Sequence, residues 1–162
     1  MSADDSRPDR RWLRHDIPHW VDDDAWFFIT INCRDRDFEQ LTLPQVSGSI
    51  LEAAKFYHNS KRWHIGLMLL MPDHLHALMG FSRGGQPMAK LFHDWKRYTA
   101  RSLNVRWQEG YFDHRLRNVA EADAKFHYIR QNPVVKGLCK APEEWPHQIR
   151  FVDGVLIMGA ER

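Results

Sequence analysis

Residues 63–79, WHIGLMLLMPDHLHALM, carry the clearest pattern of secondary structure in the chain. The first nine residues of this stretch form an apolar run short enough for one buried strand, and Pro72-Asp73 then predicts a turn. Polarity alternates after the turn, with Leu75, Ala77 and Met79 set against His74, His76 and Leu78. Side chains of a strand alternate between its two faces, so the histidines share one face and the apolar set turns toward the core.

Two histidines on one face are half of a candidate metal site. Tyr128 and Asn132 lie four residues apart in a stretch with helical character, so they share a helical face and can reach a common point. Together with His74 and His76 they would bring a metal ion and a tyrosine hydroxyl to one site. The spacing alone also allows a hairpin with two surface or hydrogen-bonded histidines and a tyrosine that serves the core, because most histidines are not metal ligands.

Three segments of the chain resemble a known family. They are MPDHLHAL (residues 71–78), WQEGYFDHRLRN (residues 107–118) and YIRQNPVVKGL (residues 128–138). They are similar to the motifs of the HUH single-tyrosine transposases, where U is a large apolar residue, and their order and spacing resemble the branch called REP-associated tyrosine transposases. The resemblance extends from about Trp12 to about Leu138.

The resemblance implies a fold, a site and a reaction. It implies an α+β fold, a ferredoxin-like antiparallel sheet with helices on one face and the histidines on a central strand. It implies that His74, His76 and Asn132 bind a divalent metal, for which Mg²⁺ or Mn²⁺ suits the expected ligands. Tyr128 would then attack single-stranded hairpin DNA and form a 5′-phosphotyrosine.

Charge is uneven along the chain, although the formal net charge is only +2. Residues 1–43 hold 10 acidic and 6 basic side chains, whereas residues 83–118 hold 3 acidic and 8 basic ones. Lys90, Arg97 and Arg101 share one face of a predicted helix that could follow a phosphate backbone. His114 and Arg115 are further candidates for DNA contact. A solvated helix face explains the basic stripe equally well.

The pattern of residues predicts strand, helix, strand, strand, helix, short strand and helix. The first strand is expected at 26–33, and helices are expected at about 44–59, from the 84–87 breaker to about 103, and from about 120 to at most 132, because Pro133 follows. We expect one transposase domain over residues 1–162, with possible flexible tails at 1–15 and about 153–162.

Composition limits the other functions. Cys33 and Cys139 form no CxxC pair, and no apolar run reaches membrane-spanning length, so we expect a cytoplasmic protein. As a DNA-acting protein it is expected to associate with the nucleoid and to act as a monomer or homodimer. Two alternatives stay open. One is a catalytically silent protein that binds hairpin DNA, and the other is a small-molecule metallohydrolase that uses His74 and His76.

Overall fold

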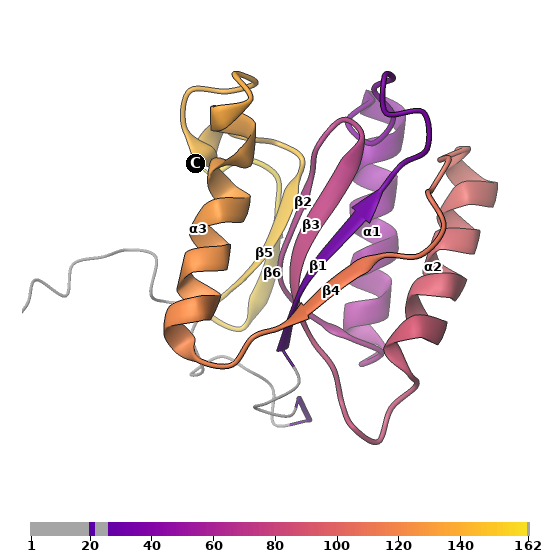
Figure 1. Cartoon of the computed structure of the whole chain (residues 1–162), viewed down its shortest axis with the longest axis vertical. Coiled ribbons are helices and arrows are strands. Elements are labelled where there is room, and N and C mark those ends of the chain that lie inside the picture. Colours follow the sequence, from indigo (N-terminus) through magenta and orange to yellow (C-terminus); the bar gives the residue numbers. More distant parts are fainter. Residues whose placement is uncertain (1–19, 22–25, 162) are drawn as a thin grey trace, which may run out of the picture.

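The computed structural model describes residues 20–21 and 26–161 of the 162-residue chain. These residues form six strands, three α-helices and one short 3₁₀ helix (Figure 1). In chain order they are β1 (Trp26–Asn32), α1 (Pro44–Asn59), β2 (His64–Leu70), β3 (His74–Gly80), α2 (Met88–Leu103), β4 (Phe112–Arg115), α3 (Val119–Val135), η2 (Pro142–Glu144), β5 (Gln148–Val152) and β6 (Val155–Met158). The predicted order of the first seven elements is confirmed.

The strands form one antiparallel sheet in the order β4-β1-β3-β2-β5-β6. The first four positions have the predicted ferredoxin-like arrangement. The histidine strand β3 is central, because β1 and β2 pair with it on its two sides. A central strand has both rows of backbone groups hydrogen-bonded, so its side chains are held in a fixed register.

Apolar side chains cover both faces of the sheet. On one face, β3 contributes Leu75, Ala77 and Met79 to a core with α1 and α2. On the other face, Leu78 belongs to a second core that includes Phe126 of α3. The predicted α+β class is therefore confirmed. The prediction of helices on one face holds for α1 and α2 but not for α3, which lies on the opposite side (Figure 1).

The end of α3 differs from its predicted boundary. The helix continues to Val135 with Pro133 inside it, one turn beyond the predicted limit at Asn132. Proline has no N–H to donate to the carbonyl one turn earlier, so the helix lacks one hydrogen bond at Pro133. Its carbonyl accepts a hydrogen bond from the Leu138 amide at 2.8 Å, and its ring is buried.

The region from about residue 153, predicted as a possible flexible tail, instead contains the edge strand β6. β5 and β6 form a hairpin in which Val152 pairs with Val155. The two residues between them are Asp153 and Gly154, with φ of 48° and 84°. An Asp-Gly pair with positive φ is a favoured two-residue hairpin turn, so the sequence carried a signal that the prediction missed. The other predicted tail, residues 1–15, lies outside the described residues.

No helix in the described part of the chain is long and apolar enough to cross a membrane.

Candidate functional site

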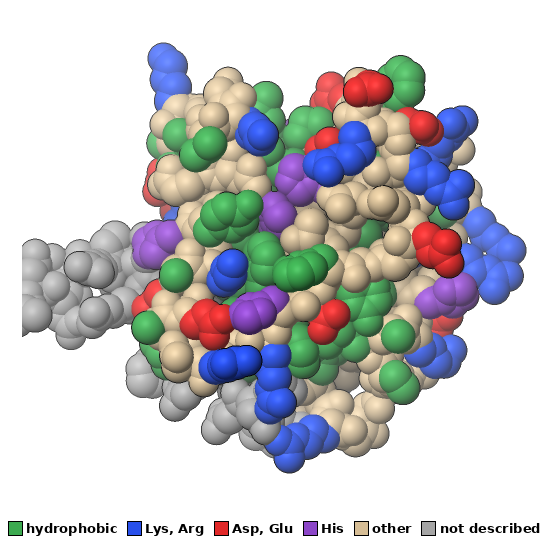
Figure 2. Space-filling view, viewed as in Figure 1, with side chains coloured by type: hydrophobic (Ala, Val, Ile, Leu, Met, Phe, Trp, Pro, Cys, Tyr) green, Lys and Arg blue, Asp and Glu red, His purple; other side chains and the backbone are tan. Residues whose placement is uncertain are grey.

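The register of the sheet puts both histidines on the face that α3 covers. His76 pairs with Thr30 and His74 with Asn32 on β1, on the face opposite the α1 and α2 helices. The two imidazole rings lie 4.8 Å apart between centroids. His74 is 8% and His76 is 6% exposed, and Figure 2 shows histidine side chains in the hollow beside α3. The predicted sharing of one face is therefore confirmed.

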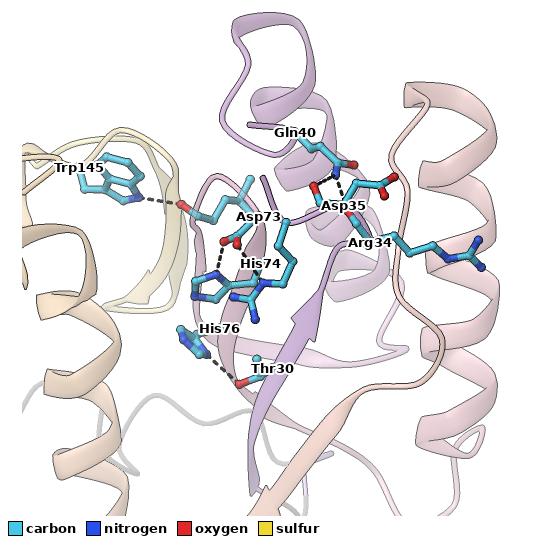
Figure 3. Close-up of polar contacts among 10 residues, drawn as sticks. Thr30, Arg34, Asp35, Gln40, Asp73, His74, His76 and Trp145 are labelled. Atoms are coloured by element: carbon cyan, nitrogen blue, oxygen red, sulfur yellow. Dashed lines mark hydrogen bonds and ion pairs between the residues drawn. The ribbon is translucent and has the colours of Figure 1, made fainter. Parts of the chain in front are cut away.

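Each imidazole is held by its Nδ1 atom (Figure 3). His74 Nδ1 lies 2.7 Å from Asp73 Oδ1, and the other oxygen of Asp73 accepts a hydrogen bond from Arg36 Nε at 2.9 Å. His76 Nδ1 lies 2.8 Å from Thr30 Oγ1. With the Nδ1 atoms engaged, Nε2 is the ring nitrogen left on each histidine to bind a ligand.

Burial keeps the imidazoles neutral. It lowers the pKa of His76 to about 3, helped by the charges of Lys125 and Arg36 and by repulsion from His74 when that ring is protonated. Burial also lowers the pKa of His74, although the Asp73 carboxylate opposes this shift. A neutral imidazole keeps a lone pair for a metal, whereas a protonated one has none. At neutral pH both side chains are therefore in the form that binds metal.

One stripe of α3 faces the histidine pair. Lys125, Tyr128 and Asn132 of α3 follow the spacing of a single helical face, and Lys136, which caps the end of the helix, continues it. At one end the Tyr128 ring lies 5.7 Å from the His76 ring, and at the other end Lys136 and His74 line the same cavity of about 340 Å³. Asn132 is half-buried on the stripe between these two contacts. It is therefore the residue of α3 best placed to complete a site with both histidines.

The side chains around His74 and His76 limit which residue types could complete a metal site. Within residues 20–21 and 26–161, no group of three or more His, Cys, Asp or Glu side chains is arranged to hold a metal ion. A metal at His74 and His76 would need an additional ligand of another type. The amide oxygen of Asn132 is a suitable oxygen donor for a hard cation.

Phe28 is the platform on which the site is built. Its ring stacks on His76 at 5.4 Å with an interplanar angle of 23°, and it meets the Tyr128 ring edge-on at 6.1 Å. Tyr128 itself is 55% exposed. The tyrosine therefore stands at the surface of the protein, supported on its inner side by Phe28 and His76 and open to solvent on its outer side.

Lys125 is a site residue that the sequence analysis missed. Its Nζ lies 4.8 Å from the centre of the Phe28 ring and 5.7 Å from that of Tyr128. This arrangement holds a cation beside the tyrosine by contact with two ring faces. The available signal was its place three residues before Tyr128, which puts both on one helical face.

The predicted DNA-binding residues of α2 are remote from this site. Lys90, Arg97 and Arg101 are exposed on a helix that covers the opposite face of the sheet. Lys90 also forms an ion pair with Asp94 at 2.9 Å. The structure therefore does not bring these three residues to the histidine pair, and their role in binding DNA stays a prediction.

The two predicted residues of β4 point to different faces. His114 pairs with Phe28 and so lies on the face of the candidate site, where its Nε2 is bonded to Glu121 of α3. Arg115 pairs with Phe27, whose ring packs against Phe81 on the other face. His114 thus fastens the start of α3 to the sheet, and DNA contact by either residue stays a prediction.

Comparison with known proteins supports the resemblance seen in the sequence. The chain is 23% identical over 132 residues to the REP-associated tyrosine transposase of Escherichia coli strain K12, covering 79% of this chain and 77% of that protein. The solved structure of a REP-associated tyrosine transposase bound to a REP hairpin matches with a TM-score of 0.68 and 21% identity, over 83% of this chain and 82% of that one. No protein-family model matches the chain. The resemblance to REP-associated tyrosine transposases and the α+β fold are confirmed.

Proposed function

We propose that this protein is a metal-dependent tyrosine transposase that cuts and rejoins single-stranded hairpin DNA through a 5′-phosphotyrosine at Tyr128. One observation carries the proposal: an exposed tyrosine lies 5.7 Å from the ring of a buried, neutral histidine that forms a pair with a second one. The relatives are named as tyrosine transposases, and the structural neighbour is bound to a REP hairpin.

His74, His76 and Asn132 would hold the metal. The fit rests on the chemistry of the histidines, because Asp73 and Thr30 engage both Nδ1 atoms and burial disfavours protonation. Two imidazoles and one amide oxygen leave positions open, as expected for Mg²⁺ or Mn²⁺. When bound, the ion would neutralise and orient the phosphate that is cut.

Tyr128 would act as the nucleophile. Its oxygen would form a bond to phosphorus while the bond from phosphorus to the 3′ oxygen breaks, and the departing 3′ oxygen would gain a proton as the tyrosine hydroxyl loses one. The ester keeps the bond energy of the broken link, so the same site can run in reverse and join another 3′ end. The exposure of Tyr128 allows a DNA strand to approach from solvent.

Lys125 would provide positive charge next to the attacking oxygen. Its Nζ rests against the rings of Phe28 and Tyr128, so a phosphate that reaches the tyrosine also comes near this ammonium. Fixed charge at the place where negative charge develops lowers the barrier to attack. We assign Lys125 a role in binding the oxygens of the scissile phosphate.

Two other functions receive less support. A silent hairpin-binding protein has no need of a tyrosine, two neutral histidines and a lysine in one place. A small-molecule metallohydrolase would be expected to have a third histidine or a carboxylate ligand, and no such group of ligands occurs among the residues that the structure describes.

Removal of the metal ligands tests the proposal. The double substitution His74→Ala and His76→Ala should abolish cleavage of a hairpin oligonucleotide in Mn²⁺ but retain most of the hairpin affinity, because phosphate contacts supply most of the binding. A chelator should stop cleavage by the unaltered protein. Cleavage at an unchanged rate in the double variant, or in the chelator, would contradict the metal site.

A further inference from the structure

A buried arginine lies on the side of α3 that faces away from the candidate site. Arg130 is 5% exposed, and its Nη2 atom forms an ion pair with the carboxylate of Glu161. In the sequence it stands two residues from both Tyr128 and Asn132, which corresponds to about 200° around a helix. The partner of Arg130 therefore acts on the rotation of the helix that carries the proposed nucleophile and a proposed metal ligand.

Glu161 joins two arginines from different elements. Its Oε1 atom lies 3.1 Å from Nη1 of Arg150 on β5 and also contacts Nη2 of Arg130 on α3. A second carboxylate, that of Glu143 in η2, lies 3.6 Å from Arg130. We call these four residues the arginine–glutamate cluster. It contains two positive and two negative charges, so the cluster as a whole is neutral.

The backbone around Glu161 is held independently of its side chain. The Glu161 amide donates to the Glu143 carbonyl at 2.7 Å, and the Gly159 amide donates to the Gln148 carbonyl at 2.8 Å. These bonds bring residues 159–161, which follow β6, to the side of α3 (Figure 1). The Glu161 carboxylate therefore occupies a fixed place beside the helix.

The buried surface of α3 is small and partly charged. Its buried side chains are Ala122, Phe126, Ile129, Arg130 and Pro133, so one of the five carries a charge. Apolar packing has no preferred direction, whereas a hydrogen-bonded ion pair holds its two groups in one geometry. A buried guanidinium has also lost its contact with water and needs its partner. Rotations of α3 that separate Arg130 from Glu161 are therefore disfavoured.

Stability alone does not account for such a cluster. A buried ion pair is often no more stabilising than apolar residues of the same volume, because the loss of solvation offsets the attraction between the charges. An ion pair adds a defined relative position of the elements that it joins. Here it joins α3 to β5, and η2 supports it through Glu143.

We infer that Glu161 is a positioning residue for the proposed reaction: it holds Arg130 and thereby sets the rotation of α3 that keeps Tyr128 beside the histidine pair. Asn132 lies on the same stripe of α3 and would move with Tyr128. The inference rests on the proposed function. Glu161 meets Arg130 on the opposite side of α3 from Tyr128, so it acts through the helix and takes no part in the chemistry.

Two substitutions at Glu161 separate its charge from its size. Glu161→Gln keeps the shape and leaves two arginines without the carboxylate between them, whereas Glu161→Asp keeps the charge on a shorter side chain. With hairpin DNA and Mn²⁺ at saturation, Glu161→Gln should cleave about 10- to 100-fold more slowly, because small displacements of reacting groups have effects of this size. Glu161→Asp should cleave faster than Glu161→Gln. Hairpin affinity, measured without metal, should not change in either variant.

A substitution in the other core separates positioning from a general loss of stability. Val46 is 6% exposed on α1, across the sheet from α3, so Val46→Ala should lower the melting temperature without contact with the helix. Well below its melting temperature, Val46→Ala should cleave like the unaltered protein. The inference is overturned if Glu161→Gln cleaves at the normal rate, or if Val46→Ala slows cleavage as much as Glu161→Gln.

Hydrogen exchange gives a measurement that does not depend on cleavage. In Glu161→Gln the backbone amides of residues 126–135 should exchange about 10-fold faster, while those of α1 keep their rates. Unchanged exchange in this part of α3 would also overturn the inference. Failure of the proposed function is a separate result, because it would appear as absence of a covalent adduct in the unaltered protein.

Discussion

The ring of Tyr128 lies 5.7 Å from the ring of His76, at an interplanar angle of 64°. One residue comes from a surface helix and the other from the central strand of the sheet. Phe28 packs against both rings. The contact brings a group able to attack phosphorus next to one able to bind a metal, and the proposed chemistry depends on this proximity.

The partners of the histidines should control metal affinity. Asp73→Ala removes the carboxylate at His74 Nδ1, and Thr30→Val removes the hydroxyl at His76 Nδ1 with little change of shape. Each should weaken Mn²⁺ binding about 10- to 100-fold, the usual effect of losing such a partner. Calorimetric titration measures the Mn²⁺ affinity directly. Glu52→Ala, at an exposed position of α1, is the control. Unchanged Mn²⁺ affinity in both variants would show that these bonds do not prepare the imidazoles for metal.

Lys125 should act on the charge of the phosphate. Lys125→Met keeps most of the side-chain length and removes the ammonium, so cleavage of natural DNA should slow about 10- to 100-fold, in line with the loss of a charged hydrogen bond. A substrate with a neutral methylphosphonate at the scissile position should be cut at equal rates by the variant and the unaltered protein.

A matched substitution distinguishes this effect from a general loss of positive charge. Lys55→Met alters a lysine on α1, across the sheet from the candidate site, and should leave both rates unchanged. If Lys125→Met slowed the two substrates by the same factor, its role would be structural instead.

Acid should destabilise the protein through His64. This side chain is 1% exposed, and burial, helped by the charge of His58, lowers its pKa to about 3. His64 takes up a proton near pH 6.5 in the unfolded chain but only near pH 3 in the folded protein. The free energy of unfolding is therefore highest above pH 6.5 as far as His64 is concerned, and it decreases as the pH falls toward 3.

The size of this effect can be measured by urea unfolding at pH 7 and pH 5. His64 should account for a loss of about 2 kcal/mol in the free energy of unfolding over this interval. His64→Leu should therefore lose about 2 kcal/mol less than the unaltered protein between the two pH values, whatever its stability at pH 7. An equal pH dependence in both proteins would show that His64 has the same pKa in the folded protein as in the unfolded chain.

Local patterns account for the parts of the fold that were predicted correctly. The bounds of α1, Pro44–Asn59, agree with those expected from a favoured first-turn proline and one apolar face. The alternation in β3 placed the histidines correctly, because a strand on a buried sheet has only two faces.

The features that were missed depend on tertiary packing or on a weak signal. No periodicity shows which face of the sheet α3 covers, since that follows from the path of the chain after β4. Pro133 is buried within the last turn of α3, and the local rule for the residue before a proline does not include such packing. The Nδ1 partners Thr30 and Asp73 could not be assigned without the register of β1 against β3 and the turn before β3.

Trapping the covalent intermediate would show whether Tyr128 attacks DNA. The protein is incubated with single-stranded hairpin DNA in Mn²⁺ and separated on a denaturing gel. We expect a slowly migrating protein–DNA adduct that Tyr128→Phe abolishes and that Tyr98→Phe retains, since Tyr98 is a tyrosine of α2 with 57% exposure against 55% for Tyr128. An undiminished adduct in Tyr128→Phe would contradict the assignment of Tyr128 as the nucleophile.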